Sequence, residues 1–190
     1  MNAQTKTVKR TIPPNEQIDV HGGKCTYGQM CDLGRVLDAA IAEQEKDTYD
    51  EIETYRRLIS VLHPNVRPCL SLSNVRYAID IARGVRHWRE QENRMLKYEP
   101  SDEEKQAGYD KLSASSGPTG VAITIAEKFG VAGKPGERVG PDVVFEWPYA
   151  TVFQVLRIDL DRYKFQKRLS DIRENKRKRK EKSTRWGRKR

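Results

Sequence analysis

The sequence predicts a mainly α-helical fold, a small bundle of about five or six helices between a disordered N-terminal arm and a basic C-terminal tail. Apolar residues recur at three- and four-residue steps in several segments, which is the spacing of one helix face. Pairs with helix-capping spacing precede these segments, and proline or glycine ends them. We expect an arm at residues 1–15, a helical domain at 16–172 and a basic tail at 173–190.

The composition fits one intracellular domain. The chain has 190 residues, of which 36% are hydrophobic and 33% are charged, so we expect an economical core and a well-solvated surface. No apolar run reaches the roughly 20 residues that a membrane helix needs, and no secretory signal is evident, so we expect no membrane partner. Three cysteines form an odd, sparse set, which favours reduced thiols over disulfides.

The positive charge is concentrated at the C-terminal end. Residues 162–190 hold 15 of the 36 Lys and Arg residues but 3 of the 27 acidic ones, a net charge of +12. Residues 1–161 carry the remaining 21 basic and 24 acidic residues, a net charge of −3. The body is therefore slightly acidic, and the overall charge of +9 belongs to the tail.

The first predicted elements follow the polar arm. Glu16 to Val20 alternates apolar and polar residues and predicts a short strand. Thr26 and Gln29 have the spacing of a capping box, so we expect the first helix to begin there. Its apolar face then consists of four residues at helical spacing: Met30, Leu33, Leu37 and Ile41.

Two further helices are predicted between residues 47 and 99. Asp47 or Thr48 can cap the second, and His63-Pro64 ends it because the residue before proline is disfavoured in a helix. Ser73 can cap the long third helix. The apolar residues expected on the two faces are Ile52, Tyr55, Ile59 and Leu62, and then Ala78, Ile81, Ala82, Val85, Trp88 and Met95.

The remaining segments predict a short exposed helix, a turn, a loop and a long final helix. Ser101 with Glu104 repeats the capping-box spacing, and that helix runs to about Leu112. A turn is expected at 113–120, a helix capped by Thr119 at 121–129 and a loop at 130–141. The final helix begins near Pro148. Its expected apolar face consists of Tyr149, Val152, Phe153, Leu156, Leu160 and Tyr163, and apolar residues cease after Ile172 until Trp186.

Residue patterns of catalysis and metal binding are weak. His21, Cys25, Cys31, His63 and Cys69 are candidate zinc ligands, but their irregular steps favour buried thiols and surface histidines. The segment Gly130-Val-Ala-Gly-Lys-Pro-Gly lacks the spacing of a phosphate-binding loop and favours a connector. No hydrolase or metalloprotease motif occurs, so we expect a protein without catalytic residues, metal or cofactor.

The basic tail is a candidate site for nucleic acid or an acidic partner. Five consecutive cations cannot be buried and repel one another, so we expect this segment to be extended or frayed in isolation. It would bind phosphates by counterion release, and an aromatic residue among the arginines can add base stacking. A solvated helix end, or docking on acidic side chains of the same or a neighbouring copy, remains an equal alternative. The candidate residues are Lys176, Arg177, Lys178, Arg179, Lys180, Lys182, Arg185, Trp186 and Arg188.

Five segments of the body carry a resemblance to a known family. The segments are Thr26-Tyr-Gly-Gln-Met-Cys-Asp-Leu, Ile59-Ser-Val-Leu-His-Pro, Gly84-Val-Arg-His-Trp, Pro100 through Gly108, and Trp147-Pro-Tyr-Ala-Thr-Val-Phe. Together they resemble the tail assembly chaperones of long-tailed bacteriophages, particularly those of phages and prophages of Bacteroides-like hosts. The similarity spans about residues 16–172, and the long basic tail departs from the family.

The resemblance implies a non-enzymatic helical protein in the cytoplasm of an infected or lysogenic bacterium. Such a protein binds the tape measure protein, keeps this long hydrophobic helix soluble and helps to recruit tail-tube subunits. A chaperone of this kind needs exposed apolar surface for a partner helix. The candidate partner-binding residues are Phe145, Trp147, Tyr149 and Phe153; an ordinary core role is the alternative, which we favour for Val152 and Phe153.

Two other classes of function stay open from the sequence. The tail favours a nucleic-acid-binding protein of a virion or nucleoid as the main alternative. The run from Lys176 to Lys180 also resembles a nuclear localisation signal, which would fit a eukaryotic nuclear protein. Oligomerisation is left open.

Overall fold

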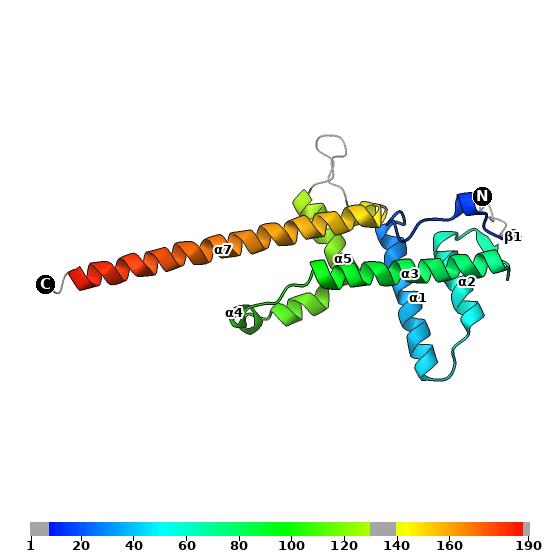
Figure 1. The fold of residues 1–190 in the computed structure, drawn as a ribbon, viewed down its shortest axis with the longest axis horizontal. Coiled ribbons are helices and arrows are strands. Elements are labelled where there is room, and N and C mark those ends of the chain that lie inside the picture. Colours follow the sequence, from blue (N-terminus) through cyan, green and yellow to red (C-terminus); the bar gives the residue numbers. More distant parts are fainter. Residues whose placement is uncertain (1–7, 130–139, 188–190) are drawn as a thin grey trace. The chain divides into compact units, whose positions relative to one another are not determined.

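A computed structural model of the chain describes residues 8–129 and 140–187. In these ranges the protein is mainly α-helical, as predicted, with seven α-helices, one short 3-10 helix and one two-stranded sheet (Figure 1). The elements in chain order are β1 (Val8–Arg10), η1 (Pro14–Glu16), α1 (Tyr27–Glu45), α2 (Glu51–Leu62), β2 (Val66–Pro68), α3 (Leu72–Met95), α4 (Asp102–Gln106), α5 (Tyr109–Phe129), α6 (Pro141–Phe145) and α7 (Tyr149–Gly187).

The chain forms two compact units, a first unit of Met1–Phe153 and a second unit of Gln154–Arg190. The division falls inside α7, and this helix runs without interruption through residue 172, where the sequence predicted that the helical domain ends. None of the helices in the described ranges combines the length and the apolar content needed to cross a bilayer.

Residues 8–15 belong to the folded part of the first unit, so the predicted arm is too long. Strand β1 pairs in parallel with β2, with Val8 opposite Val66. Ile12 is fully buried, and its backbone N–H donates to Oδ1 of the buried Asn74 at 2.9 Å. Long-range pairing thus orders a polar segment that has no local signal of its own. The strand predicted at 16–20 is wrong, because only η1 and irregular backbone occur there.

Helix α1 begins as predicted. The Thr26 hydroxyl accepts a hydrogen bond from the Gln29 backbone N–H at 3.1 Å, and the Gln29 side chain accepts one from the Thr26 N–H at 3.0 Å. This reciprocal capping box satisfies two backbone donors that a helix start leaves without partners. Met30 and Leu33 are buried on the predicted face, whereas Ile41, near the other end of the helix, is 55% exposed.

The starts of α2 and α3 lie two or three residues from their predicted positions. Asp50 caps α2 by accepting from the Glu53 N–H, and Ser71 caps α3 by accepting from the Asn74 N–H. The predicted cap Asp47 has a φ of 58°, and Thr48 instead donates to the carbonyl of Glu43 at the end of α1. Several polar residues precede each helix, and only tertiary packing selects one of them as the cap.

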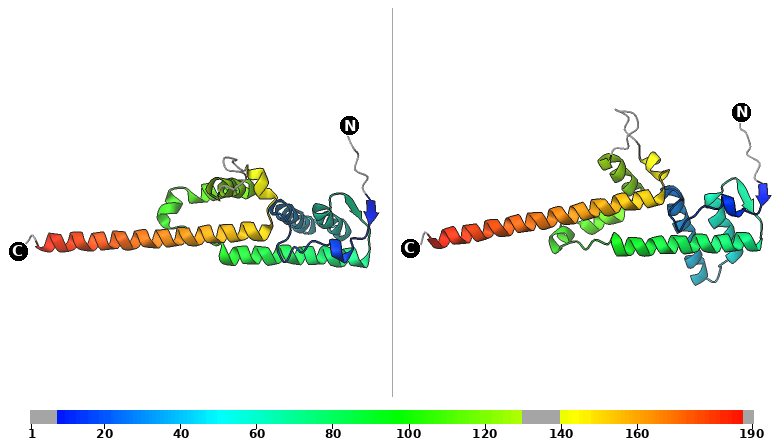
Figure 2. Two further views of the ribbon diagram at one scale, coloured as in Figure 1. Left: turned by 90° about the horizontal axis from the view of Figure 1, so that it is seen from above. Right: turned by 45° about the horizontal axis from the view of Figure 1, so that its top comes forward.

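Helices α1 and α2 lie side by side in opposite directions and pack on α3, which crosses them (Figures 1 and 2). The core between them is aliphatic, with Leu33, Leu58, Ile59, Ile81 and Val85 buried. Gly84 of α3 allows a close approach of the 20–21 segment. A Cβ at this position would lie 2.8 Å from the His21 backbone nitrogen and 2.9 Å from a Val20 methyl carbon.

The segment after α3 differs in part from its prediction. The capping box of Ser101 and Glu104 opens α4 as expected, but this helix ends at Gln106. The predicted turn at 113–120 is shorter in the structure, because α5 begins at Tyr109 and its backbone leaves the helical conformation only at Gly117. A kink at Gly117, whose φ is 46°, replaces the turn, and Pro118 follows it without a backbone donor. Most of the predicted loop at 130–141 lies outside the described residues.

The start of α7 is joined to the start of α1. The Tyr27 N–H donates to the carbonyl of Trp147, and the Tyr149 N–H donates to the carbonyl of Cys25, both at 2.8 Å. These bonds form an antiparallel bridge between Thr26 and Pro148. The short helix α6, which the sequence analysis missed, precedes this bridge and buries Val144.

The close approach at Gly84 gives a first testable prediction. Replacement Gly84→Ala forces the 20–21 segment away from α3, so we expect the free energy of unfolding to fall by about 1–3 kcal/mol. Gly140→Ser is the matched control, since nothing lies within 4 Å of a Cβ there and serine is a good N-cap for α6. Chemical denaturation followed by circular dichroism measures both; equal stability of the two variants would contradict the packing described.

Candidate functional site

Two hollows among the described residues of the first unit share the side chain of Arg89. One is a cavity of about 410 Å³ between the start of α1, the end of α3, the kink of α5 and the start of α7. The other is a groove of about 330 Å³ along α1, α2 and α3. Both lie within the range of roughly 300–1,000 Å³ found for ligand pockets.

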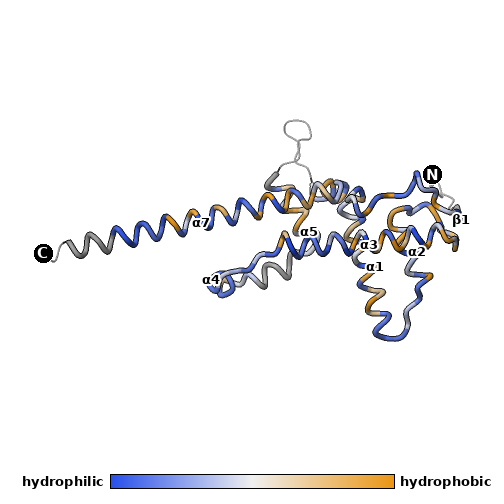
Figure 3. The backbone as a smooth tube through the Cα atoms, in the orientation of Figure 1, coloured by the Kyte–Doolittle hydropathy of each residue, from blue (hydrophilic) through white to orange (hydrophobic). Residues whose placement is uncertain are grey.

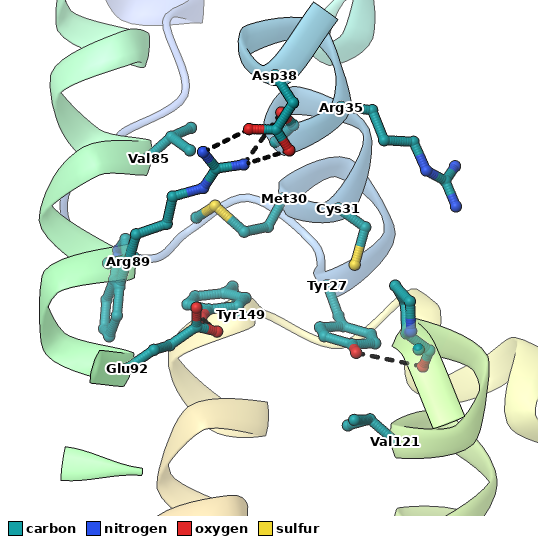
Figure 4. A pocket seen from close by; sticks show the side chains of 14 residues that line it. Tyr27, Met30, Cys31, Arg35, Asp38, Val85, Arg89, Glu92, Val121 and Tyr149 are labelled. Carbon is teal, nitrogen blue, oxygen red and sulfur yellow. Dashed lines mark hydrogen bonds and ion pairs between the residues drawn. The ribbon is translucent and has the colours of Figure 1, made fainter. Parts of the chain in front are cut away.

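The wall between α1 and α3 is held by one ion pair. Arg89 donates to both carboxylate oxygens of Asp38, at 2.8 and 2.9 Å, and to the carbonyl of Gly34 at 3.1 Å (Figure 4). Gly34 makes this possible, since a Cβ there would lie 3.1 Å from the same guanidinium nitrogen. Both side chains are 40% or more exposed, so the pair contributes up to about 1 kcal/mol and mainly fixes geometry.

The cavity combines an apolar lining with a few polar groups. Tyr149 donates its hydroxyl to Glu92, and Tyr27 donates to the carbonyl of Pro118 at 3.2 Å. Arg35 is directed away from the Arg89–Asp38 pair (Figure 4). The lining residues are Tyr27, Met30, Cys31, Gly34, Arg35, Asp38, Val85, Trp88, Arg89, Glu92, Gly117, Pro118, Val121 and Tyr149.

Two phenols and one thiol of the cavity, those of Tyr27, Tyr149 and Cys31, are held in their neutral forms. Burial raises the pKa of the Tyr149 phenol, and the nearby Glu92 carboxylate raises it further. Burial likewise raises the pKa of Tyr27 and of the Cys31 thiol. A thiol needs a lowered pKa to act as a nucleophile at neutral pH, so Cys31 is poorly suited to that chemistry. The cavity thus combines apolar side chains such as Met30 and Val85 with charged groups on α1 and α3.

The groove has an apolar floor and an open rim. Leu58 and Ala40 are buried at its floor, while Ile41 is 55% and Tyr49 is 41% exposed at its edge. Exposed apolar side chains beside a hollow are a common feature of interaction surfaces. The full set of lining residues is Leu37, Ala40, Ile41, Gln44, Tyr49, Thr54, Tyr55, Leu58, Ala82, Arg86 and Arg89.

Two of the four predicted partner-binding residues lie in the core instead. Tyr149 is 3% and Phe153 is 4% exposed, and both rings pack edge-on against Trp88, with centroids 5.0 and 5.1 Å away. For Phe153 this is the core role favoured from the sequence. Tyr149 is likewise a core residue and not an exposed partner contact, because the bridge to α1 turns this part of α7 inward. Phe145 is half-buried and stacks on Tyr27, and Trp147 is also half-buried, so both keep part of their surface accessible.

The candidate zinc ligands are dispersed over separate interactions. His21 stacks on His87 at 4.1 Å, and His63 Nε2 lies 3.1 Å from the Tyr77 hydroxyl. Cys69 Sγ contacts the Thr11 hydroxyl, and burial raises the pKa of the Cys25 thiol to about 11. Within residues 8–129 and 140–187, no three His, Cys, Asp or Glu side chains are grouped as metal ligands.

The basic segment continues helix α7. Its backbone is helical to Gly187, which agrees with the alternative of a solvated helix end and not with an extended segment. The side chains of Lys176 through Lys180 are all exposed, and Glu174 pairs with Lys178 at 2.7 Å. Such an i,i+4 pair supports a solvated helix. The side chains of three other candidates, Lys182, Arg185 and Trp186, and the whole of Arg188 lie outside the described residues.

The second unit also exposes apolar residues that the sequence analysis did not single out as a site. Ile158, Phe165 and Ile172 of α7 are 47%, 59% and 52% exposed. Apolar and polar residues alternate along this part of the helix before it becomes uniformly hydrophilic (Figure 3). These three residues are seven positions apart, a spacing that the sequence shows. The same stretch of sequence also contains the predicted apolar face from Tyr149 to Tyr163, and only that face was recognised.

The Arg89–Asp38 pair and Glu92 were missed for a different reason. Arg89 and Asp38 are 51 residues apart, and no local pattern brings them together. Arg89 and Glu92 do lie beside Val85 and Trp88 on the predicted apolar stripe of the third helix. The position of these two charged residues beside the apolar stripe was the one feature of the sequence that indicated polar groups at the buried side of this helix.

Comparison with protein-family models, with curated proteins and with solved structures finds no match to this chain.

The buried thiol gives a second testable prediction. With a pKa of about 11, Cys25 is almost entirely protonated at pH 8, and burial also blocks reagents, so iodoacetamide should label it slowly. We expect labelling at least tenfold faster in denaturant. Cys69, which is half-buried, is the internal control and should change less. Peptide mass spectrometry over time distinguishes the sites; rapid labelling of native Cys25 would contradict its placement.

Proposed function

We propose that this chain is a non-enzymatic helix-binding protein that acts as a tail assembly chaperone of a long-tailed bacteriophage. Its partner would be the tape measure protein, in the cytoplasm of an infected or lysogenic bacterium, and it would help to recruit tail-tube subunits. The observation that carries this proposal is the groove along α1, α2 and α3, which is apolar at its floor and open at its edge. The resemblance of the sequence to such chaperones supplies the identity of the partner.

The groove suits an amphipathic helix for three reasons. Its floor offers aliphatic and aromatic surface to side chains spaced three or four residues apart. Ile41 and Tyr49 stand at its edge and can pack against the flank of such a helix. Arg86 is exposed on its α3 side and would favour acidic residues beside the apolar stripe of the partner. A long hydrophobic helix held in this way is shielded from aggregation.

Co-expression tests this function. The full chain should raise the soluble fraction of a tape measure protein encoded in the same genome, whereas Ile41→Glu should lower the affinity at least tenfold by placing a charge at the groove edge. Ile123→Glu is the matched control, because Ile123 is 40% exposed in the same unit but lines neither hollow. No rescue by the parent chain would refute the function, and equal loss in both variants would refute the groove as its site.

Nucleic-acid binding by the basic segment of α7 is the second candidate function. It is favoured by five consecutive exposed cations, Lys176 to Lys180, on a helix that can lie along a phosphate backbone. Attraction of this kind carries little sequence preference, so it would supplement protein binding in a virion or nucleoid without specifying a site.

Salt dependence tests the second candidate. Affinity for unrelated double-stranded DNA should fall steeply with salt, with a log–log slope of about −0.9 for each phosphate contacted. Replacing Lys176, Arg177 and Lys178 by glutamine should reduce both the affinity and the slope. Replacing Arg76, Arg83 and Arg86 of α3 by glutamine is the control, which removes the same amount of charge outside the basic segment. Fluorescence anisotropy measures the binding, and affinity that survives deletion of residues 173–190 would exclude the segment.

A further inference from the structure

The second unit carries a narrow apolar stripe along α7, on a different face of the helix from Leu156, Leu160 and Tyr163. The stripe is defined by Val155, Ile158, Phe165, Leu169 and Ile172 of α7. Ile158, Phe165 and Ile172 are about half exposed, and Val155 and Leu169 are partly exposed. Successive members are three, seven, four and three residues apart, which matches the a and d positions of a heptad repeat. A seam of this spacing is covered most effectively by another helix.

Arg162 occupies the a position between Ile158 and Phe165. The other a and d positions of the stripe are all apolar. A charged residue at such a position restricts which partner and which register can be accepted. In a parallel pair of α7 helices, Arg162 would face Arg162 of the other copy. Arg168 would also face Arg173 across the seam, and the two basic segments from Lys176 onward would run side by side. A parallel pair is therefore opposed by like charges at Arg162, between Arg168 and Arg173, and along the basic segments.

An antiparallel pair reverses these relations. With its two-fold axis between Tyr163 and Lys164, Val155 faces Ile172 of the other copy and Ile158 faces its Leu169. Arg162 then lies over the ring of the other Phe165, where the guanidinium can stack on the aromatic face. The six resulting layers contain two such Arg–Phe pairs at the centre and apolar pairs on both sides.

The flanking charges favour the same arrangement. At the edge of the antiparallel seam, Asp161 of each copy faces Arg168 of the other, so the dyad generates two identical opposite-charge pairs. The basic segments, which begin at Lys176, project from opposite ends of the seam and stay apart. Shifting the register by one heptad would bring Arg162 against aliphatic side chains and would lose the Asp161–Arg168 pairs.

We propose that the apolar stripe of α7 is a self-association surface on which a second copy of this chain binds in antiparallel orientation. The seam covers about 27 Å of helix, since residues 155–172 rise by about 1.5 Å each. An interface of this length is short, so the dimer forms reversibly in the micromolar range rather than as an obligate assembly. The proposal is independent of the groove in the first unit and of its partner.

Sedimentation equilibrium of the full chain tests the association. We expect a monomer–dimer equilibrium, and Phe165→Asp should weaken dimerisation at least tenfold. Tyr163→Asp is the matched control on the same helix, since Tyr163 is 46% exposed but lies away from the stripe. A monomer at all concentrations up to about 1 mM, or equal weakening by the two variants, would overturn the proposal.

A charge exchange tests the orientation. Asp161→Arg should weaken the dimer, because the introduced guanidinium would then face Arg168 of the other copy, and the double variant Asp161→Arg/Arg168→Asp should restore it. In a parallel pair Asp161 faces Gln166 and Arg168 faces Arg173, so Arg168→Asp alone would strengthen the dimer. In the antiparallel pair the same single change places two carboxylates opposite each other and weakens it. A dimer that is insensitive to Asp161→Arg, or that the double variant fails to restore, would overturn the antiparallel arrangement.

A distance measurement gives an independent readout of orientation. In a chain with Cys25, Cys31 and Cys69 replaced by alanine, a nitroxide on Asn175→Cys reports the separation of the two helices near their basic ends. Antiparallel pairing places the two backbone positions about 35 Å apart at 1.5 Å of rise per residue. A parallel pair would place them about 10 Å apart, the usual spacing of packed helices, and would refute the proposal.

Discussion

The first unit depends on the backbone bridge that joins residues 25–27 to residues 147–149. Its two hydrogen bonds fix the first turn of α7 beside the first turn of α1. Because of this contact, Tyr149 and Phe153 turn inward and pack on Trp88 of α3. The same contact brings the Tyr149 hydroxyl to Glu92 and closes one side of the cavity. Segments from both ends of the unit thus share one core.

Local chemistry explains the parts of the fold that the sequence could predict. The capping boxes at Thr26 and Ser101 involve residues three positions apart, so their spacing is readable without knowledge of the fold. The end of α2 at His63 follows from Pro64 in the same way. The sequence also predicts most of the longer helices, because apolar residues recur at three- and four-residue steps along each of them.

Long-range contacts explain what could not be predicted. Val8–Arg10 becomes a strand because β2 lies beside it, and the buried Ile12 donates its backbone N–H to Asn74, 62 residues away. Tyr149 has the same helical spacing whether it faces a core or a partner, and the bridge to α1 decides between the two. The groove and the Arg89–Asp38 pair likewise depend on the relative positions of α1 and α3, which no local sequence pattern gives. The candidate sites were therefore less predictable than the helices.

The bridge between residues 25–27 and 147–149 also determines the order in which the chain can fold during synthesis. Closing a loop of more than one hundred residues carries an entropic cost, which is recovered only after the final segment has left the ribosome. Helices α1, α2 and α3 have one another as packing partners much earlier. The α1–α3 groove can therefore form on the nascent chain, whereas the cavity waits for α7. A partner that arrives during translation would meet the groove first.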